Sequence, residues 1–362
     1  MPRSFAVWLS IVVLPVSLFA QDSTSAARRP AGHWHIGLAI HDNGLTIGNA
    51  ARTNGIRINA VDADLELVNG DNITFWRPRE PLTGTINGLA VGLAPGAEQS
   101  NGIAVGLAAV VAEQRARWIT IGGLAVVSNS TLEGLAISGL GTVANADVSG
   151  IAVAGLGTVA NRDVRGILIA GLGAVANRDV SGLAIAGLGT VANDDMTGVG
   201  VAGLGTVANG NLAGIMIGGL ATVSNRNLTG LGISGLATVA NGNSTGLSFG
   251  GLAAVTNGTL KGLGLAGLSV VANEGLRGVG LAGYTVDSRS IHGWSTALYV
   301  KTRELRGLSI GAYNRVRGPQ VGVSIGIYNS ARVLNGLQIG VLNRAQNNKG
   351  LAKILPLINA HF

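Results

Sequence analysis

The sequence has no cysteine among its 362 residues, only 4% aromatic residues and only 12% charged residues. The absence of cysteine excludes disulfides, thiolate metal ligands, a cysteine nucleophile and a lipid-modified N-terminal cysteine. The charged fraction is about half that of ordinary soluble proteins. Glycine, in contrast, occurs 58 times, and small and branched apolar residues are plentiful. This composition favours a thin, regular structure with small side chains inside over a thick globular core.

Residues 1–20 have the pattern of a secretory signal peptide. Arg3 supplies a basic start, residues 5–13 are mostly apolar, and Pro15 interrupts the segment. A short membrane anchor is the alternative, but the apolar run is shorter than the ~20 residues that a membrane-spanning helix needs. We therefore expect an exported protein, and export argues against a nucleic-acid partner.

A 16-residue repeat dominates the middle of the chain. From Gly134 the sequence reads GLAISGLGTVANADVS and then GIAVAGLGTVANRDVR, and the pattern keeps its register to Gly278. Each unit starts with the apolar-small alternation of a β-strand and closes with an asparagine-containing turn signal. The asparagines that recur once in every unit are Asn129, Asn145, Asn161, Asn177, Asn193, Asn209, Asn225, Asn241, Asn257 and Asn273. Fixed self-similarity of this kind indicates a repeat architecture.

The repeat is looser at both ends of the chain. Upstream, Asn-Gly dipeptides recur at irregular intervals, and downstream GLSIGAYN, GVSIGIYN and GLQIGVLN start at Gly307, Gly322 and Gly336, a slightly shorter period. Asn-Gly favours tight turns because both residues tolerate positive φ. The resulting division is residues 1–20, a signal peptide; 21–35, a flexible basic segment; 36–101, divergent repeats; 102–293, regular repeats; and 294–362, basic, aromatic repeats with a cap.

Two all-β architectures fit a unit of this length. In an elongated β-solenoid of 14–16-residue coils, each unit is one turn, and neighbouring coils pair in parallel about 4.8 Å apart. In an outer-membrane β-barrel, each unit is one tilted strand of ~10 residues plus a turn. Barrels carry aromatic girdles, but Phe249 is the only aromatic residue between Ile119 and Gly283. We therefore predict the solenoid and keep the barrel as the alternative.

The solenoid prediction leads to two expectations about where side chains lie. A bend near Gly139 would turn Leu135, Ile137, Leu140 and Val143 into the core together. The recurring asparagines would stack on successive coils and pass amide hydrogen bonds along a structural ladder, as in cross-β assemblies. The alternative for the asparagines is a linear strip that binds a ligand.

Segments near the two ends resemble a known group of proteins. GLQIGVLN, GVSIGIYN and GLSIGAYN resemble the motifs of bacterial surface-repeat-containing proteins, which recur about every 14 residues. NGIRINAVD, NGDNITFWRP and NGLAVGLAP are similar to the leading part of the same group. The alternation also has a generic likeness to the β-roll heads of trimeric autotransporter adhesins. The middle departs from the family by its longer period. The resemblance implies a bacterial surface protein and supplies no catalytic residues.

Candidate chemistry is sparse. Glycine pairs abound, but none follows a lone strand and opens a helix, so a dinucleotide site is unsupported. Turn aspartates such as Asp163 could gather Ca²⁺, but Arg162 adjoins Asp163, which favours solvated turn charge. His33 and His35 lack a carboxylate or cysteine to complete a metal site. We therefore expect no enzyme activity, no metal and no cofactor.

Positive charge gathers at the C-terminal end. Residues 287–362 hold ten Lys or Arg against Asp287 and Glu304, a net charge of +8, whereas the other residues sum to −1. Such a segment can attract outer-membrane lipid, lipopolysaccharide or an acidic glycan. The alternative is a polar cap that prevents end-to-end stacking. The candidates for contact with an anionic surface are Arg303, Arg306, Arg315, Arg317 and Arg332.

Together these features predict an exported protein of the Gram-negative cell surface or outer membrane. Its expected role is structural or adhesive, through contact with a host or matrix ligand. A porin-like barrel channel is the alternative function.

Overall fold

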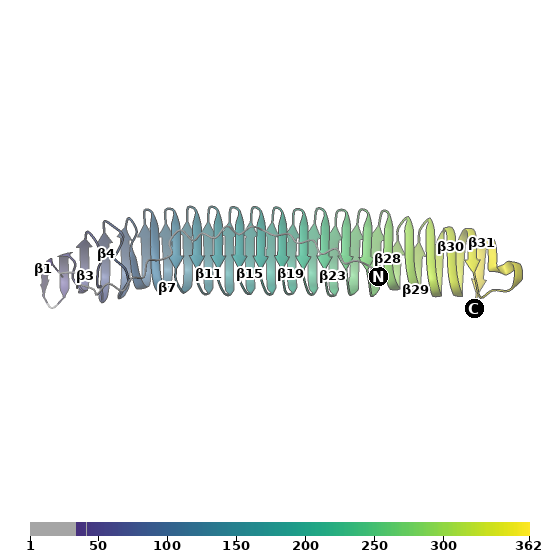
Figure 1. Cartoon of the computed structure of the whole chain (residues 1–362), viewed down its shortest axis with the longest axis horizontal. Coiled ribbons are helices and arrows are strands. Elements are labelled where there is room, and N and C mark those ends of the chain that lie inside the picture. Colours follow the sequence, from purple (N-terminus) through teal and green to yellow (C-terminus); the bar gives the residue numbers. More distant parts are fainter. Residues whose placement is uncertain (1–33, 41) are drawn as a thin grey trace, which may run out of the picture. The chain divides into compact units, whose positions relative to one another are not determined.

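The computed structural model describes residues 34–40 and 42–362, which form a continuous stack of β-coils (Figure 1). The expected signal peptide lies outside the described residues, as do residues 21–33. The first strands are β1 (His35–Ile40), β2 (Asn43–Gly48), β3 (Arg52–Asn59), β4 (Leu67–Thr74), β5 (Thr85–Gly92), β6 (Gly96–Gly106) and β7 (Ala109–Gly122). None of the helices in the described part is long and apolar enough to cross a membrane.

Each regular unit contributes one long and one short strand. The long strands are β9 (Thr131–Ser138), β11 (Val148–Ala154), β13 (Val164–Ala170), β15 (Val180–Ala186), β17 (Met196–Ala202), β19 (Leu212–Gly218), β21 (Leu228–Ser234), β23 (Ser244–Gly250), β25 (Thr259–Ala266) and β27 (Gly275–Ala282). The short strands are β8 (Ala125–Ser128), β10 (Gly141–Ala144), β12 (Gly157–Ala160), β14 (Gly173–Ala176), β16 (Gly189–Ala192), β18 (Gly205–Ala208), β20 (Ala221–Ser224), β22 (Ala237–Ala240), β24 (Ala253–Thr256) and β26 (Ser269–Ala272).

The C-terminal coils have longer strands that bend through the turns. Their elements are β28 (Thr285–Thr296), β29 (Tyr299–Ile310), β30 (Tyr313–Ala345), the 3-10 helix η1 (Gly350–Lys353) and β31 (Ile354–His361). β31 folds back on β30 in the antiparallel direction, and β1 pairs with β2 in the same way at the other end. These two pairs close the ends of the stack.

Consecutive units pair in parallel. Ile151 of β11 lies beside Ile167 of β13, and Gly141 of β10 lies beside Gly157 of β12, so each residue neighbours its equivalent in the next unit. From β8 to β27, long strands pair with long strands and short with short, so two stacks of strands enclose one interior. The strands β7 and β28 bend through both stacks and join them into one sheet. The protein is therefore a β-solenoid. The barrel alternative is wrong, because its adjoining strands would run in opposite directions.

Most of the interior is filled by small side chains, and most coils also bury one larger apolar residue near the start of the long strand. In one coil, Val148, Ala152, Ala154, Thr158 and Ala160 are all buried. The short strands bury alternate residues throughout, always a small aliphatic or hydroxyl side chain next to the interior. Larger side chains enter where a neighbour is small. Thus Met196 and Met216 occupy the space that a Cβ on Gly200 would need.

The expectation that the larger apolar residues face inward is wrong. Ile137 and Leu140 are exposed, and Leu135 and Val143 are only partly buried, whereas Ala136 and its small neighbours fill the core. The turn at residues 139–140 contains two residues, so it preserves the alternation from the long strand to the short strand. The face that carries Leu135 and Ile137 therefore stays outside across the bend.

Candidate functional site

One edge of the solenoid carries the recurring asparagines. Asn161 Nδ2 donates to Asn145 Oδ1 at 2.8 Å, and Asn177 Nδ2 donates to Asn161 Oδ1 at 2.8 Å. The same bond joins every consecutive pair from Asn129 to Asn273. The sequence-predicted residues thus form one continuous, exposed amide column. Because each amide is already engaged with its neighbours, a structural role accounts for the column.

The turn aspartates form a second column beside the asparagines. Asp195 accepts a hydrogen bond at 2.7 Å from the backbone N–H of Asn211, and Asp179 accepts one at 2.9 Å from the backbone N–H of Asp195. The guanidinium of Arg178 lies 3.6 Å from the Asp163 carboxylate. These carboxylates therefore help to fix the turns. No cluster of three or more His, Asp or Glu side chains that could hold a metal occurs in the described part of the chain.

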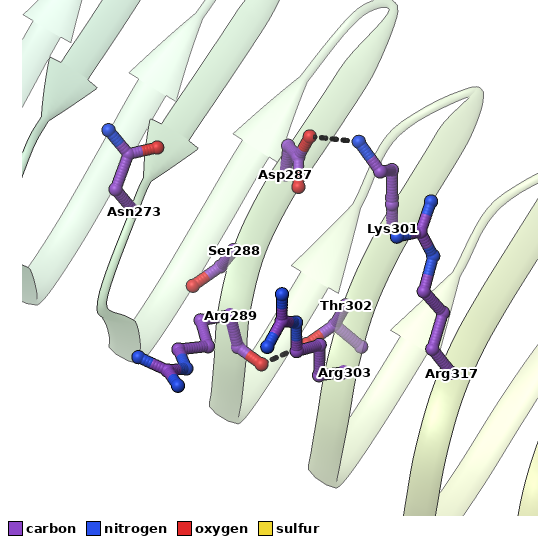
Figure 2. A pocket seen from close by; sticks show the side chains of 8 residues that line it. All are labelled: Asn273, Asp287, Ser288, Arg289, Lys301, Thr302, Arg303 and Arg317. Carbon is purple, nitrogen blue, oxygen red and sulfur yellow. Dashed lines mark hydrogen bonds and ion pairs between the residues drawn. The ribbon is translucent and has the colours of Figure 1, made fainter. Parts of the chain in front are cut away.

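Arginines continue the asparagine column toward the C-terminus. Ala272 pairs with Ser288, and Ser288 pairs with Thr302, so the residues that follow them stack on one edge. Asn273, Arg289, Arg303 and Arg317 occupy that position on successive coils (Figure 2). The polar edge thus changes from neutral amides to cations between β26 and β28.

The arginines line a hollow of about 350 Å³ on this edge. Its lining residues are Asn273, Asp287, Ser288, Arg289, Lys301, Thr302, Arg303 and Arg317. Lys301 Nζ is 2.7 Å from Asp287 Oδ2, and this pair forms one wall (Figure 2). Among the described residues, no acidic group lies within 4.0 Å of the Arg289, Arg303 or Arg317 guanidinium. We call this group of residues the arginine pocket.

The structure places two of the five arginines expected to contact an anionic surface in one pocket. Arg303 and Arg317 line the arginine pocket, whereas Arg306, Arg315 and Arg332 do not. Arg306 is instead 2.8 Å from the Glu304 carboxylate. The histidine pair considered above, His33 and His35, is not tested, because His33 lies outside the described residues.

Arg289 and Lys301 belong to the pocket but were not among the sequence candidates. A signal for Arg289 was available in the spacing of the sequence. The interval from Asn273 to Arg289 equals one regular coil, and the interval from Arg289 to Arg303 equals one shorter coil. Lys301 could be placed only once the pairing of β28 with β29 was known.

Comparisons with known proteins add no relative. No protein-family model matches the chain, and neither a curated protein sequence nor a solved structure matches it. The resemblance to bacterial surface-repeat proteins therefore stays a prediction, and function has to be argued from the site itself.

Proposed function

We propose that this chain is an exported, non-enzymatic surface protein of a Gram-negative bacterium, a stiff adhesive rod that binds an acidic glycan at the arginine pocket. The observation that carries the proposal is the column of arginines on successive coils with no acidic partner among the described residues. The fold supplies rigidity, because backbone pairing and the amide ladder tie each coil to the next.

The charge of the pocket favours a linear anionic ligand. Arg289, Arg303 and Arg317 follow one another at the strand spacing of about 4.8 Å. The three positive charges that line one pocket repel one another, and a ligand with several carboxylate or sulfate groups offsets that repulsion. Guanidinium groups also bind such oxyanions with paired N–H donors. A polymer lying along the axis can meet several of them at once.

The surroundings of the pocket favour a glycan among anionic ligands. The pocket opens on the edge that carries Asn273 and the rest of the amide column. Amides and hydroxyls are the groups that pair with sugar hydroxyls. A ligand that extends from the arginine pocket toward the N-terminus would meet this amide column next.

Titration with heparin, a sulfated polysaccharide, tests the proposal. The double variant R303Q/R317Q removes two charges from the pocket, and R306Q/R332Q removes two charges outside it. We expect the pocket variant to weaken heparin binding by about tenfold or more, because each lost guanidinium removes charge-assisted hydrogen bonds. The matched control should change affinity much less.

Neutral dextran serves as the ligand control and should not bind. Equal weakening by both double variants would show attraction by net charge alone and would contradict the pocket. Failure of the unaltered chain to bind heparin at moderate salt would also count against the proposal.

A further inference from the structure

The outer surface of the regular coils is apolar over one edge. The two-residue turn between each long and short strand presents one leucine, and these side chains are 45–53% exposed. From Leu140 onward, each leucine N–H donates to the leucine carbonyl of the preceding coil, for example Leu172 to Leu156 at 2.7 Å. We call this column the leucine edge: Leu124, Leu140, Leu156, Leu172, Leu188, Leu204, Leu220, Leu236, Leu252 and Leu268.

Apolar residues also cover the sheet faces on both sides of the leucine edge. The long strands point branched residues outward, such as Ile151 at 39% exposure and Ile169 at 37%. The short strands point a valine outward in each coil, and Val159 and Val175 are examples that are only partly buried. The apolar surface therefore wraps three sides of the solenoid: two opposite faces and the edge between them.

Charge is confined to the opposite edge and to the start of the adjoining long strands, where Arg165, Lys261 and Arg277 lie. All twelve charged residues between positions 134 and 283 lie within four residues after a ladder asparagine. They include the turn pairs Arg162–Asp163 and Arg178–Asp179. The cross-section of every regular coil is therefore amphipathic, and the same side is apolar for ten coils, about 48 Å at the strand spacing.

Trp118 marks the border between these two surfaces. It replaces the glycine that other coils have at this position, as its pairing with Gly102 and Gly134 shows. Its side chain is 72% exposed, and its φ of 78° is costly for a bulky residue. Tryptophan is the residue enriched where a protein passes from lipid to water. Trp294, which pairs with Val279, adds a second partly exposed indole on the long-strand side.

We propose that the solenoid lies along a lipid surface, with the leucine edge and its flanking faces inserted among the acyl chains and the asparagine edge in water. This inference does not depend on ligand binding at the arginine pocket. It extends the principle of the interfacial amphipathic helix to a parallel β-structure. The arginine pocket, which continues the asparagine edge, would then face away from the lipid.

The shape of the apolar surface favours lipid over a second copy of the chain. The leucine edge and its two flanking faces together form a convex wedge. A flat partner sheet could cover only one of the two faces, and the edge and the other face would stay in water. Fluid acyl chains can follow all three sides. Exposed apolar patches of ordinary monomers are also limited to a few hundred Å², whereas this surface continues coil after coil.

Site-specific labelling tests the orientation. The chain has no cysteine, so Leu172→Cys and Arg178→Cys each give a single site for an environment-sensitive dye. The full chain is mixed with phosphatidylcholine vesicles, whose lack of net charge removes attraction to the basic end. We expect a blue shift at position 172 and quenching there by brominated acyl chains. Position 178 should show neither.

A matched pair of triple variants tests the affinity. Substituting glutamine at Leu156, Leu172 and Leu188 should weaken vesicle binding by on the order of a hundredfold, since each change removes apolar area from the wedge. All three side chains are about half exposed, and circular dichroism checks that the fold is kept. The control places glutamine at three exposed turn residues of the asparagine edge: Arg162, Arg178 and Arg226.

Three outcomes would overturn the proposal. The first is that the unaltered chain fails to float with the vesicles, and the second is that both dye positions respond alike. The third is a concentration-dependent dimer without lipid in which the dye at position 172 is already shielded. That result would assign the leucine edge to contact between copies of the chain.

Discussion

At the residue scale, two positions in each coil require glycine because the coils stack closely on one another. The glycine near the start of each long strand has positive φ, as at Gly166 (φ 135°), and a Cβ there would collide with the carbonyl oxygen of Gly150 on the previous coil. The glycine before each exposed leucine faces the same collision, as Gly171 does with Gly155. The glycine after that leucine is free of it, because a Cβ on Gly173 would lie 4.0 Å from the nearest oxygen.

A matched pair of alanine substitutions tests this distinction. Gly166→Ala should lower the free energy of unfolding by at least about 2 kcal/mol, because alanine is strained at this φ and has no room. Gly173→Ala should change it by less than ~0.5 kcal/mol, in keeping with Ala221 and Ala237 at equivalent positions. Urea titration followed by circular dichroism measures both. Equal losses would contradict the stacking argument.

At the element scale, the side chains that fill the interior change from apolar to polar toward both ends of the stack. In register with the buried alanines of the regular coils lie Arg57 and Asn72, both fully buried. Arg57 pairs with the buried carboxylate of Asp62 and donates at 2.8 Å to Asn72 Oδ1. At the other end, buried Asn314 donates at 2.7 Å to Asn329. Polar networks therefore replace the aliphatic filling near both ends of the stack.

Removing one member of the N-terminal ion pair should loosen the first coils. We expect Arg57→Met to destabilise β2 to β4 by about 3 kcal/mol, because Asp62 is left as a buried, unpaired charge. Adding Asp62→Leu should recover much of that loss. Hydrogen exchange resolves the effect, which should fade along the stack because each coil contacts only its neighbours. Uniform loss of protection to β27 would contradict this local view.

At the scale of the whole repeat array, the 16-residue register makes the solenoid modular. Every pairing from β9 to β27 joins equivalent positions, so one unit can leave without changing the contacts of those that remain. Stability then resembles a sum over coils and the interfaces between them. Coils of other lengths occur only toward the ends, as where Gly278 pairs with Gly293 and Gly293 pairs with Gly307.

Two deletions test this modularity. Removing residues 150–165 joins Ser149 to Gly166 in register, and we expect a folded rod shortened by about 4.8 Å with little change in melting temperature. Removing residues 150–157 instead places a short strand where a long strand is needed and breaks the asparagine ladder. It should separate the stack into two unfolding transitions. Circular dichroism and small-angle scattering measure both variants, and similar melting of the two would refute a register-dependent stack.

The repeat, the strands and the stacking of asparagines could be predicted from the sequence, because these features follow from local periodicity. Asn145 and Asn161 occupy the same place in adjoining units, so parallel coils bring their amides together. The same reasoning placed Leu140 inside, since larger apolar residues usually fill cores. It also grouped Arg306 with Arg303, although only Arg303 lines the pocket.

The amino-acid sequence by itself determined that the chain is a regular β-repeat with segregated charge, because a fixed period places equivalent side chains in equivalent positions. Only the tertiary structure decided which face of each strand is inside. A two-residue turn keeps the alternation in step, so the turn leucines such as Leu140 lie outside. The interior is filled by alanine and threonine side chains together with one larger apolar side chain in most coils, such as Leu212. Periodicity alone does not specify that choice of face, because it depends on contacts between units. The same holds for the shorter coils, which align Arg289, Arg303 and Arg317.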